Sequence, residues 1–75
     1  MKYIKFNNNQ IALFSRDLTH RSMARSVETM GGFRAYPVSA GFVTRHEREV
    51  FCYGRSESLN LDSNPEDARL IEVLI

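Results

Sequence analysis

The residue types that could carry out nucleophilic catalysis are few in this chain of 75 residues. Ser56, His20 and Asp17 could supply a nucleophile, a base and an orienting acid, the set that a hydroxyl nucleophile requires. Such a trio occurs in nearly every protein, and the GxSxG turn that exposes a nucleophilic serine is absent. The sequence therefore predicts no catalytic residues, and we expect a protein that is not an enzyme.

Metal ligands are also poorly placed along the chain. The soft ligands are two histidines and one cysteine, and none has the paired spacing of a zinc site: His20, His46 and Cys52. Oxygen ligands at positions 62, 64 and 66 match the start of a calcium loop. However, the sixth position of that loop is Asp67 in place of Gly, and the twelfth is Val73 in place of Glu. We therefore expect no metal and no cofactor.

The segment GRSESLNLDSNPEDARLIEVLI (54–75) combines a glycine, serines and a helix start, which are features of phosphate-binding loops. The GxxxxGK[ST] pattern is absent. Asn64 caps the helix start, Pro65 lacks an N–H group, and Glu66 and Asp67 bring negative charge that repels a phosphate. We interpret the segment as a capped amphipathic helix that runs to residue 75, with an apolar face of Ala68, Ile71, Leu74 and Ile75.

Basic residues concentrate in the first half of the chain. Residues 1–36 carry six Lys and Arg against two acids, whereas residues 37–75 carry four Arg against seven acids. A molecule with two oppositely charged sides favours oriented docking on a charged partner, although small domains often show such a split by chance. The predicted partner-binding residues are the arginines of the basic half: Arg16, Arg21, Arg25 and Arg34.

Two alternative functions would use the same arginines. The simplest interpretation is that these arginines lie on a solvated helix face and bind nothing. Arginine and tyrosine side chains (Tyr3, Tyr36, Tyr53) could hold a small nucleotide, because guanidinium groups bind phosphates and aromatic rings stack on bases. A nucleic-acid-binding domain is less favoured, because the pI of about 7.9 falls below the value above about 9 that is typical of such domains.

The apolar pattern predicts one domain, residues 1–75, of the α+β class. A hairpin is expected at 3–6 and 10–14 around Asn8 and Asn9, and a second at 38–43 and 50–53. Thr19 is expected to cap a helix from His20 to Met30, and 58–61 could add a short strand. The expected fold is an antiparallel sheet of four to five strands with two helices on one face, in the order ββαββ(β)α.

The sequence also predicts the environment of three individual residues. His20 is expected to be a partly exposed surface residue near the start of the first helix. Cys52 is expected to be a small core residue and not a reactive thiol. Gly41 interrupts a strand, which predicts a bulge or a close approach of another backbone segment.

The chain contains one cysteine and no apolar run that approaches the roughly 18 residues of a membrane-spanning helix. An internal disulfide therefore cannot form, and a reducing compartment is expected. Asn7, Asn8 and Asn9 interrupt the apolar start of the chain, so it lacks the pattern of a signal peptide. We expect a cytoplasmic protein that does not bind membranes.

The segments VSAGFV (38–43), YGRSESLNLDSNPEDARLI (53–71) and MKYIKF (1–6) resemble small proteins of unknown function that are encoded by tailed phages and prophages of enteric bacteria. The shared pattern is an SAGF strand followed by Y/F-G-x-S-x-S-L-x-L-x-S-x-P-E-D at a helix start. The resemblance implies a fold and a genomic setting more than an activity.

In that setting, many short accessory proteins block a host enzyme or a defence complex. The resemblance therefore implies a non-enzymatic protein that binds and inhibits a host protein complex in the bacterial cytoplasm, for example as an anti-CRISPR-like or other counter-defence protein. The alternatives are a nucleotide-binding sponge that sequesters a signalling molecule and a small nucleic-acid-binding protein. A homodimer is a further hypothesis, because the final helix has an apolar face and a small sheet leaves its edges unpaired.

Overall fold

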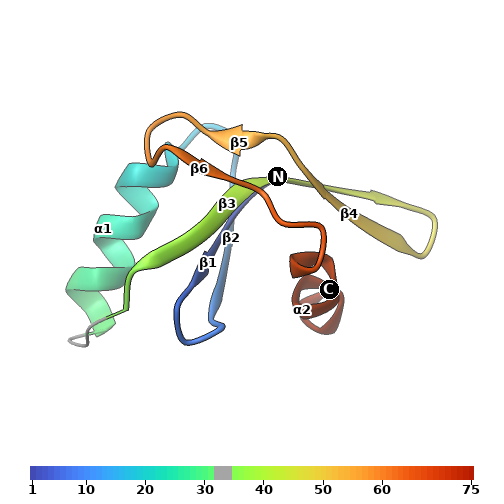
Figure 1. Cartoon of the computed structure of the whole chain (residues 1–75), viewed down its shortest axis with the longest axis horizontal. Coiled ribbons are helices and arrows are strands. Elements are labelled where there is room, and N and C mark those ends of the chain that lie inside the picture. Colours follow the sequence, from blue (N-terminus) through green and yellow to red (C-terminus); the bar gives the residue numbers. More distant parts are fainter. Residues whose placement is uncertain (32–34) are drawn as a thin grey trace.

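The computed structural model describes the backbone of residues 1–31 and 35–75 and the side chains of residues 1–28 and 35–75. Its elements, in chain order, are β1 (Lys2–Phe6), β2 (Ile11–Phe14), α1 (His20–Gly31), β3 (Pro37–His46), β4 (Glu49–Tyr53), β5 (Arg55–Ser56), β6 (Leu61–Asp62) and α2 (Asp67–Leu74). This is an α+β fold, and the predicted class and order of elements are confirmed (Figure 1).

The main sheet is antiparallel and has the strand order β2-β1-β3-β4. The predicted turn between β1 and β2 is confirmed: the Phe6 N–H donates to the Gln10 carbonyl at 2.9 Å, and Asn9 takes a φ of 66°. Asn tolerates this left-handed conformation better than most residues, which explains the asparagine-rich turn. In the second hairpin, Glu47 takes the corresponding positive φ of 58°.

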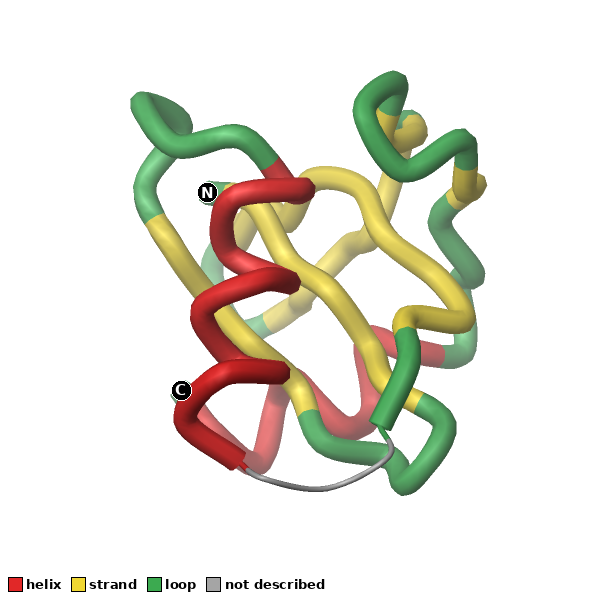
Figure 2. The backbone as a smooth tube through the Cα atoms, turned by 90° about the vertical axis from the view of Figure 1, so that its left-hand side faces the viewer, coloured by secondary structure: helices red, strands yellow, loops and turns green. Residues whose placement is uncertain are grey.

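The two helices cover opposite faces of the main sheet, so the prediction that both lie on one face is wrong (Figures 1 and 2). Successive side chains of a strand point to opposite faces. Ile4 and Phe6 of β1 pack with Ala24 of α1, whereas Tyr3 packs with Ile71 of α2. Because β1 carries large buried side chains on both sides, both faces of the sheet require a covering helix.

Of the segment 58–61, which could have added a short strand or an extended edge, residues 58–60 form a turn between β5 and β6, and Leu61 begins β6. Strands β5 and β6 form a separate two-stranded sheet. The Ser56 hydroxyl, which is completely buried, accepts a hydrogen bond from the Leu59 N–H at 3.2 Å. Asn60 takes a φ of 55°. Such a side-chain-to-backbone bond stabilises a turn in place of an extended strand, so local hydrogen bonding prevails over the alternation of apolar residues.

Helix α1 agrees closely with the expected helix. It begins at His20, and the Ser22 N–H donates to the hydroxyl of Thr19 at 3.0 Å, as an N-cap requires.

Helix α2 begins at Asp67, two residues beyond Pro65. The Asn64 side chain does not cap this helix but accepts a hydrogen bond from the Glu66 N–H at 3.0 Å, in the turn before it.

The apolar face predicted for α2 is only partly buried. Ile71 is fully buried and Ala68 is half-buried, but Leu74 and Ile75 remain 55% and 47% exposed. Leu74 is the last residue of the helix and Ile75 is its C-cap. Helical spacing therefore identified the correct face but not how far along the helix this face is covered.

Gly41 of β3 confirms the expected close backbone approach. A Cβ atom at this position would lie 2.6 Å from the Tyr53 carbonyl oxygen and 2.9 Å from the Ser63 Cβ. Both neighbours are held by backbone structure, since Phe42 pairs with Tyr53 and the Ser63 N–H donates to Gly54. The glycine lets β3 lie against the chain that leads to α2.

We expect Gly41→Ala to lower the free energy of unfolding by about 2 kcal/mol or more, since the added methyl group overlaps a backbone oxygen that cannot move away cheaply. Urea denaturation followed by circular dichroism measures this change. Val38→Ala on the same strand is the matched control, because Val38 is 40% exposed. Equal stabilities of the two variants would contradict the close approach.

Candidate functional site

The carboxylate of Asp67 is completely buried, with 0% of the residue exposed. One of its oxygens, Oδ2, accepts hydrogen bonds from the Tyr3 hydroxyl at 2.7 Å and from the Ser39 hydroxyl at 2.5 Å. The other oxygen, Oδ1, lies 3.2 Å from the Lys5 ammonium nitrogen in an ion pair that lacks hydrogen-bond geometry. This Asp67 network joins the first turn of α2 to β1 and β3.

The tyrosine of the Asp67 network is held in its neutral form. Burial raises the pKa of Tyr3 far above its usual range, and the hydrogen bond to Asp67 raises it further. The Tyr3 oxygen also accepts the N–H of Asn64 at 3.1 Å, which partly opposes this increase. A phenol that cannot ionise near neutral pH is a hydrogen-bond donor and not a base, so the network is suited to holding α2 on the sheet.

His20 is buried, with 3% exposure, so the expectation of a partly exposed surface residue is wrong. Its Nε2 atom lies 2.8 Å from the Gly41 carbonyl oxygen, which can only accept, so Nε2 carries the hydrogen. The ring meets Phe14 and Phe42 edge-on, at centroid distances of 5.4 and 5.9 Å. Burial lowers the pKa of His20, and the neighbouring charge of Lys2 adds to that effect.

Two of the three residues that could have formed a catalytic trio, His20 and Ser56, have other partners. The hydrogen bond of His20 goes to Gly41, and Ser56 is bonded to Leu59 and lies 3.5 Å from the hydroxyl of Ser58. Within the part of the chain whose side chains are described, no hydrogen bond links His20 with Ser56 or Asp17. In that same part, no group of three His, Cys, Asp or Glu side chains could hold a metal ion.

Cys52 is half-buried against the cluster of apolar residues under α2, as expected for a small core residue. Burial raises the pKa of its thiol, and the negative charge of Asp67 contributes to the same shift. A thiol that resists ionisation is a poor nucleophile.

An exposed cluster of arginine and aromatic side chains lies on the β3–β4 hairpin, on the face opposite α2. The Arg16 guanidinium lies 5.7 Å from the centre of the Phe42 ring, and its Nη2 donates to the Tyr53 hydroxyl at 3.0 Å. The Phe42 and Tyr53 rings stack at 5.6 Å with an interplanar angle of 26°. Phe51, two residues before Tyr53, points to the same face. We call these four residues, Arg16, Phe42, Phe51 and Tyr53, the arginine–aromatic surface.

The arginine–aromatic surface is exposed because the hairpin extends beyond the helix that would cover it (Figure 1). Side chains of β4 alternate: Val50 and Cys52 face α2, whereas Phe51 and Tyr53 face the opposite side and remain 46% and 42% exposed. Large aromatic side chains that remain this exposed in a small domain indicate an interaction surface more often than a scattered apolar residue does.

A concavity of about 450 Å³ adjoins this surface and shares Phe42 with it. Its lining includes two cations, Lys2 and Arg55, together with His20. Both cations are already engaged: Lys2 donates to the Leu18 carbonyl at 2.7 Å, and Arg55 lies 3.6 Å from Glu57. Binding of an anion here would have to compete with these contacts.

The predicted basic patch is distributed over two elements. Arg16 belongs to the arginine–aromatic surface, whereas Arg21 and Arg25 are exposed one turn apart on α1. Arg34 lies outside the described residues. The role of these four arginines in partner binding stays a prediction. The geometry of the described residues singles out Arg16, because its side chain contacts the Phe42 ring and the Tyr53 hydroxyl.

Two important residues, Phe51 and Asp67, were missed in the sequence. Phe51 carried a signal, since it shares a strand face with Tyr53, which the sequence had suggested only as a nucleotide-binding residue, but nothing local indicated that this face would stay uncovered. Asp67 carried no such signal, because its partner Tyr3 is 64 positions away in the chain.

Comparisons of the chain with protein-family models, with curated proteins and with solved structures found no match in any of the three. The resemblance to small phage-encoded proteins therefore stays a prediction from the motif alone. In the described part of the chain, no helix is long and apolar enough to cross a membrane.

We expect Asp67→Ala to lower the free energy of unfolding by about 3–5 kcal/mol, because it leaves Lys5, Tyr3 and Ser39 without their shared partner. Chemical denaturation measures the loss, and Glu66→Ala is the matched control because Glu66 is the exposed neighbour. If Asp67→Ala is too unstable to purify, Asp67→Asn retains the shape and should lose less. An Asp67→Ala protein as stable as the control would show that the network contributes nothing.

The folded protein should lose stability when the pH falls below about 6.5, the ordinary pKa of histidine. The pKa of His20 is lowered by burial in the folded state, so the unfolded chain takes up the proton first and acidification favours unfolding. Urea denaturation at pH 7.5 and 5.5 should show this loss in the native protein and a smaller loss in His20→Gln. His46→Gln, which changes an exposed histidine, should behave as the native protein does; an identical loss in all three would exclude His20 as the cause.

Proposed function

We propose that this protein is a non-enzymatic binding protein that docks on a partner protein through the arginine–aromatic surface. The observation that carries the proposal is the ordered stack of Arg16, Phe42 and Tyr53 on an uncovered face of the β3–β4 hairpin. Tyrosine and arginine are the residue types, along with tryptophan, that contribute most of the binding energy in protein interfaces.

The stack is suited to binding because Arg16 already has partners within it. A long arginine side chain normally loses about 2 kcal/mol of conformational freedom when a partner immobilises it. Here, the hydrogen bond to the Tyr53 hydroxyl and the contact with the Phe42 ring restrict the Arg16 side chain before binding, so less freedom is lost. A partner therefore meets a flat aromatic platform with a fixed positive charge, which favours an acidic or aromatic surface on the partner.

The kind of partner is proposed from the resemblance of the sequence to small phage-encoded proteins. In this view, the protein is a phage or prophage accessory protein that acts in the cytoplasm of its bacterial host and inhibits a host protein complex, such as a defence system. A small domain that covers an active site or an assembly surface needs no chemistry of its own. Arg21 and Arg25 on α1 would extend the contact surface.

The experiment is a pull-down with the tagged protein from nuclease-treated bacterial lysate, followed by mass spectrometry of the retained proteins. We expect one stoichiometric host complex with the native protein, and at least about a tenfold loss of affinity with Arg16→Glu or Tyr53→Ala, as is typical of hot-spot residues. Arg69→Glu is the matched control, because it makes the same charge change on the exposed side of α2. Arg21→Glu and Arg25→Glu then measure the contribution of α1.

Binding that survives both Arg16→Glu and Tyr53→Ala, in folded protein, would overturn the assignment of this surface. Circular dichroism of each variant establishes that the fold is retained. Retention of nucleic acid in place of a protein, with an affinity that falls steeply with salt, would favour the nucleic-acid-binding alternative.

A second function, sequestration of a small nucleotide, is favoured by the concavity beside the arginine–aromatic surface. Its lining combines Phe42 with two cations, Lys2 and Arg55, that could bind phosphate groups. A base that stacks on the Phe42 ring would displace Tyr53 or Arg16 from it. Protein purified from bacterial lysate and then denatured should release a compound that absorbs at 260 nm if this function is correct. A protein spectrum free of such absorbance would contradict it.

A further inference from the structure

Strand β2 forms one edge of the main sheet, and it carries no charged residue, proline or bulge that would protect such an edge. Natural sheets block their edges with charged residues, proline or bulges that prevent pairing with another chain. The edge segment Gln10–Phe14 has the sequence QIALF, with no charge and no proline. The opposite edge, β4, begins with Glu49, which follows Arg48, so charged residues stand at its start.

At two residues of this edge, Ile11 and Leu13, the backbone N–H and C=O groups point away from β1. The Gln10 carbonyl accepts the Phe6 N–H, so the backbone groups of Gln10 face β1. Because these groups alternate in direction along an antiparallel strand, those of Ile11 and Leu13 face away from β1. An incoming strand would find two N–H and two C=O groups ready to pair with it.

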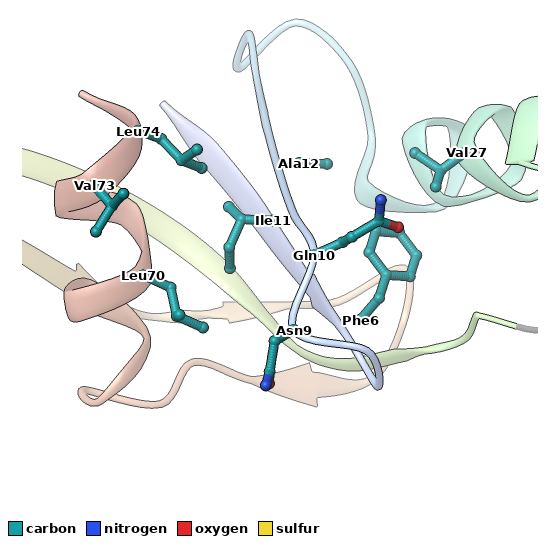
Figure 3. Close-up of a pocket in the computed structure, with 9 residues that line it drawn as sticks. All are labelled: Phe6, Asn9, Gln10, Ile11, Ala12, Val27, Leu70, Val73 and Leu74. Carbon is teal, nitrogen blue, oxygen red and sulfur yellow. The ribbon is translucent and has the colours of Figure 1, made fainter.

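An apolar groove of about 500 Å³ follows the same edge (Figure 3). Ala12 and Val27 line it on the α1 side of the sheet, whereas Ile11 and Leu70 line it on the α2 side. The groove therefore extends around the edge of β2. Val73 of α2, which is 85% exposed, continues the apolar lining outward.

We propose that a second copy of this chain occupies the groove by pairing its β2 antiparallel with this β2, across a two-fold axis at Ala12. The main sheets of the two copies then join into one continuous sheet of eight strands. This proposal does not depend on the arginine–aromatic surface, which lies on the β3–β4 hairpin and not on the β2 edge.

The register follows from the geometry of the strand. Residues that face each other across an antiparallel pair lie on the same side of the sheet, so Ile11 can face Leu13 of the second copy, since both lie on the α2 side. Both have outward backbone groups, so this pairing forms hydrogen bonds twice across the axis. Ala12 then faces its own copy in a pair without hydrogen bonds, where side chains come closest, and its small methyl group fits there.

A second copy suits this edge better than an unrelated chain because the segment is complementary to itself. With the axis at Ala12, Gln10 faces Phe14 of the second copy, and no charged residues are opposed within the strand. Beyond the strand, Arg16 would come opposite Asn8 of the second copy, so like charges do not meet. The apolar ends of both α2 helices lie on the same face of the joined sheet, where each can cover the exposed apolar residues of the other.

The first test is sedimentation equilibrium of the native protein, which should show a dimer that dissociates on dilution. Ala12→Lys and Ala12→Glu should each raise the dissociation constant by about a hundredfold or more, because two like charges would meet at the axis. An equimolar mixture of these two variants should recover the dimer, since opposite charges then face each other. A monomeric native protein at all concentrations, or a mixture that remains monomeric while both variants are folded, would overturn the proposal.

A second test perturbs the strand less. Ala12→Cys in a Cys52→Ala background should form a disulfide-linked dimer under mild oxidation, since facing Cα atoms in this type of pair lie within the range of about 4.4–6.8 Å that a disulfide spans. Gln10→Cys in the same background is the control, because its facing residue is Phe14 and not its own copy. Equal cross-linking of the two variants would exclude the proposed register.

Discussion

The fold depends on one buried carboxylate. Asp67 stands at the start of α2, has no exposed surface, and accepts the hydroxyl groups of Tyr3 and Ser39 while Lys5 balances its charge. A charge without partners in this position would cost several kcal/mol, so α2 is stable on the sheet only when all of these groups meet. The eight residues of α2 bury only one large apolar side chain completely, Ile71, and the polar contacts therefore fix where the helix lies.

The placement of α2 decides which parts of the sheet stay uncovered. Strand β3 has ten residues and spans about 33 Å, whereas an eight-residue helix is about 12 Å long. The helices lie on opposite faces, and α1 ends its contact with the hairpin near Phe42. The outer part of the β3–β4 hairpin therefore has a free face, where Tyr53 stacks on Phe42 and Arg16 lies over the Phe42 ring.

The uncovered surfaces have different chemistry, which suits them to different tasks. The hairpin presents a positive charge fixed on aromatic rings, a combination that favours a charged or aromatic partner surface. The β2 edge is neutral and apolar and presents unpaired backbone groups, a combination that favours another strand of the same kind. A dimer built through β2 would leave both arginine–aromatic surfaces exposed, so self-association and partner binding are compatible in one assembly.

The sequence by itself determined the features that depend on neighbouring residues. The order of elements, the α1 helix capped by Thr19 and the asparagine turn at Asn9 all follow from local conformational preference. Gly41 marked a special position in its strand, but which of a bulge or a close approach it served was decided by Tyr53 and Ser63. The limits of α2 were less accurate, because a turn at Asn64 delays its start. The turn at 57–60 was missed because a buried serine side chain stabilises it.

Only the tertiary structure decided the features that join distant segments. Asp67 resembled a surface residue of a first helical turn, and its burial follows from contacts with strands 28 and 64 positions away. His20 is buried because two aromatic residues from different strands close over it. The same holds for the candidate site: Arg16 was among the predicted residues, but its ordering on Phe42 and Tyr53 requires the loop after β2 to lie beside the β3–β4 hairpin. Neighbouring residues do not predict such contacts, because the contacts stabilise the protein only when the whole sheet has formed.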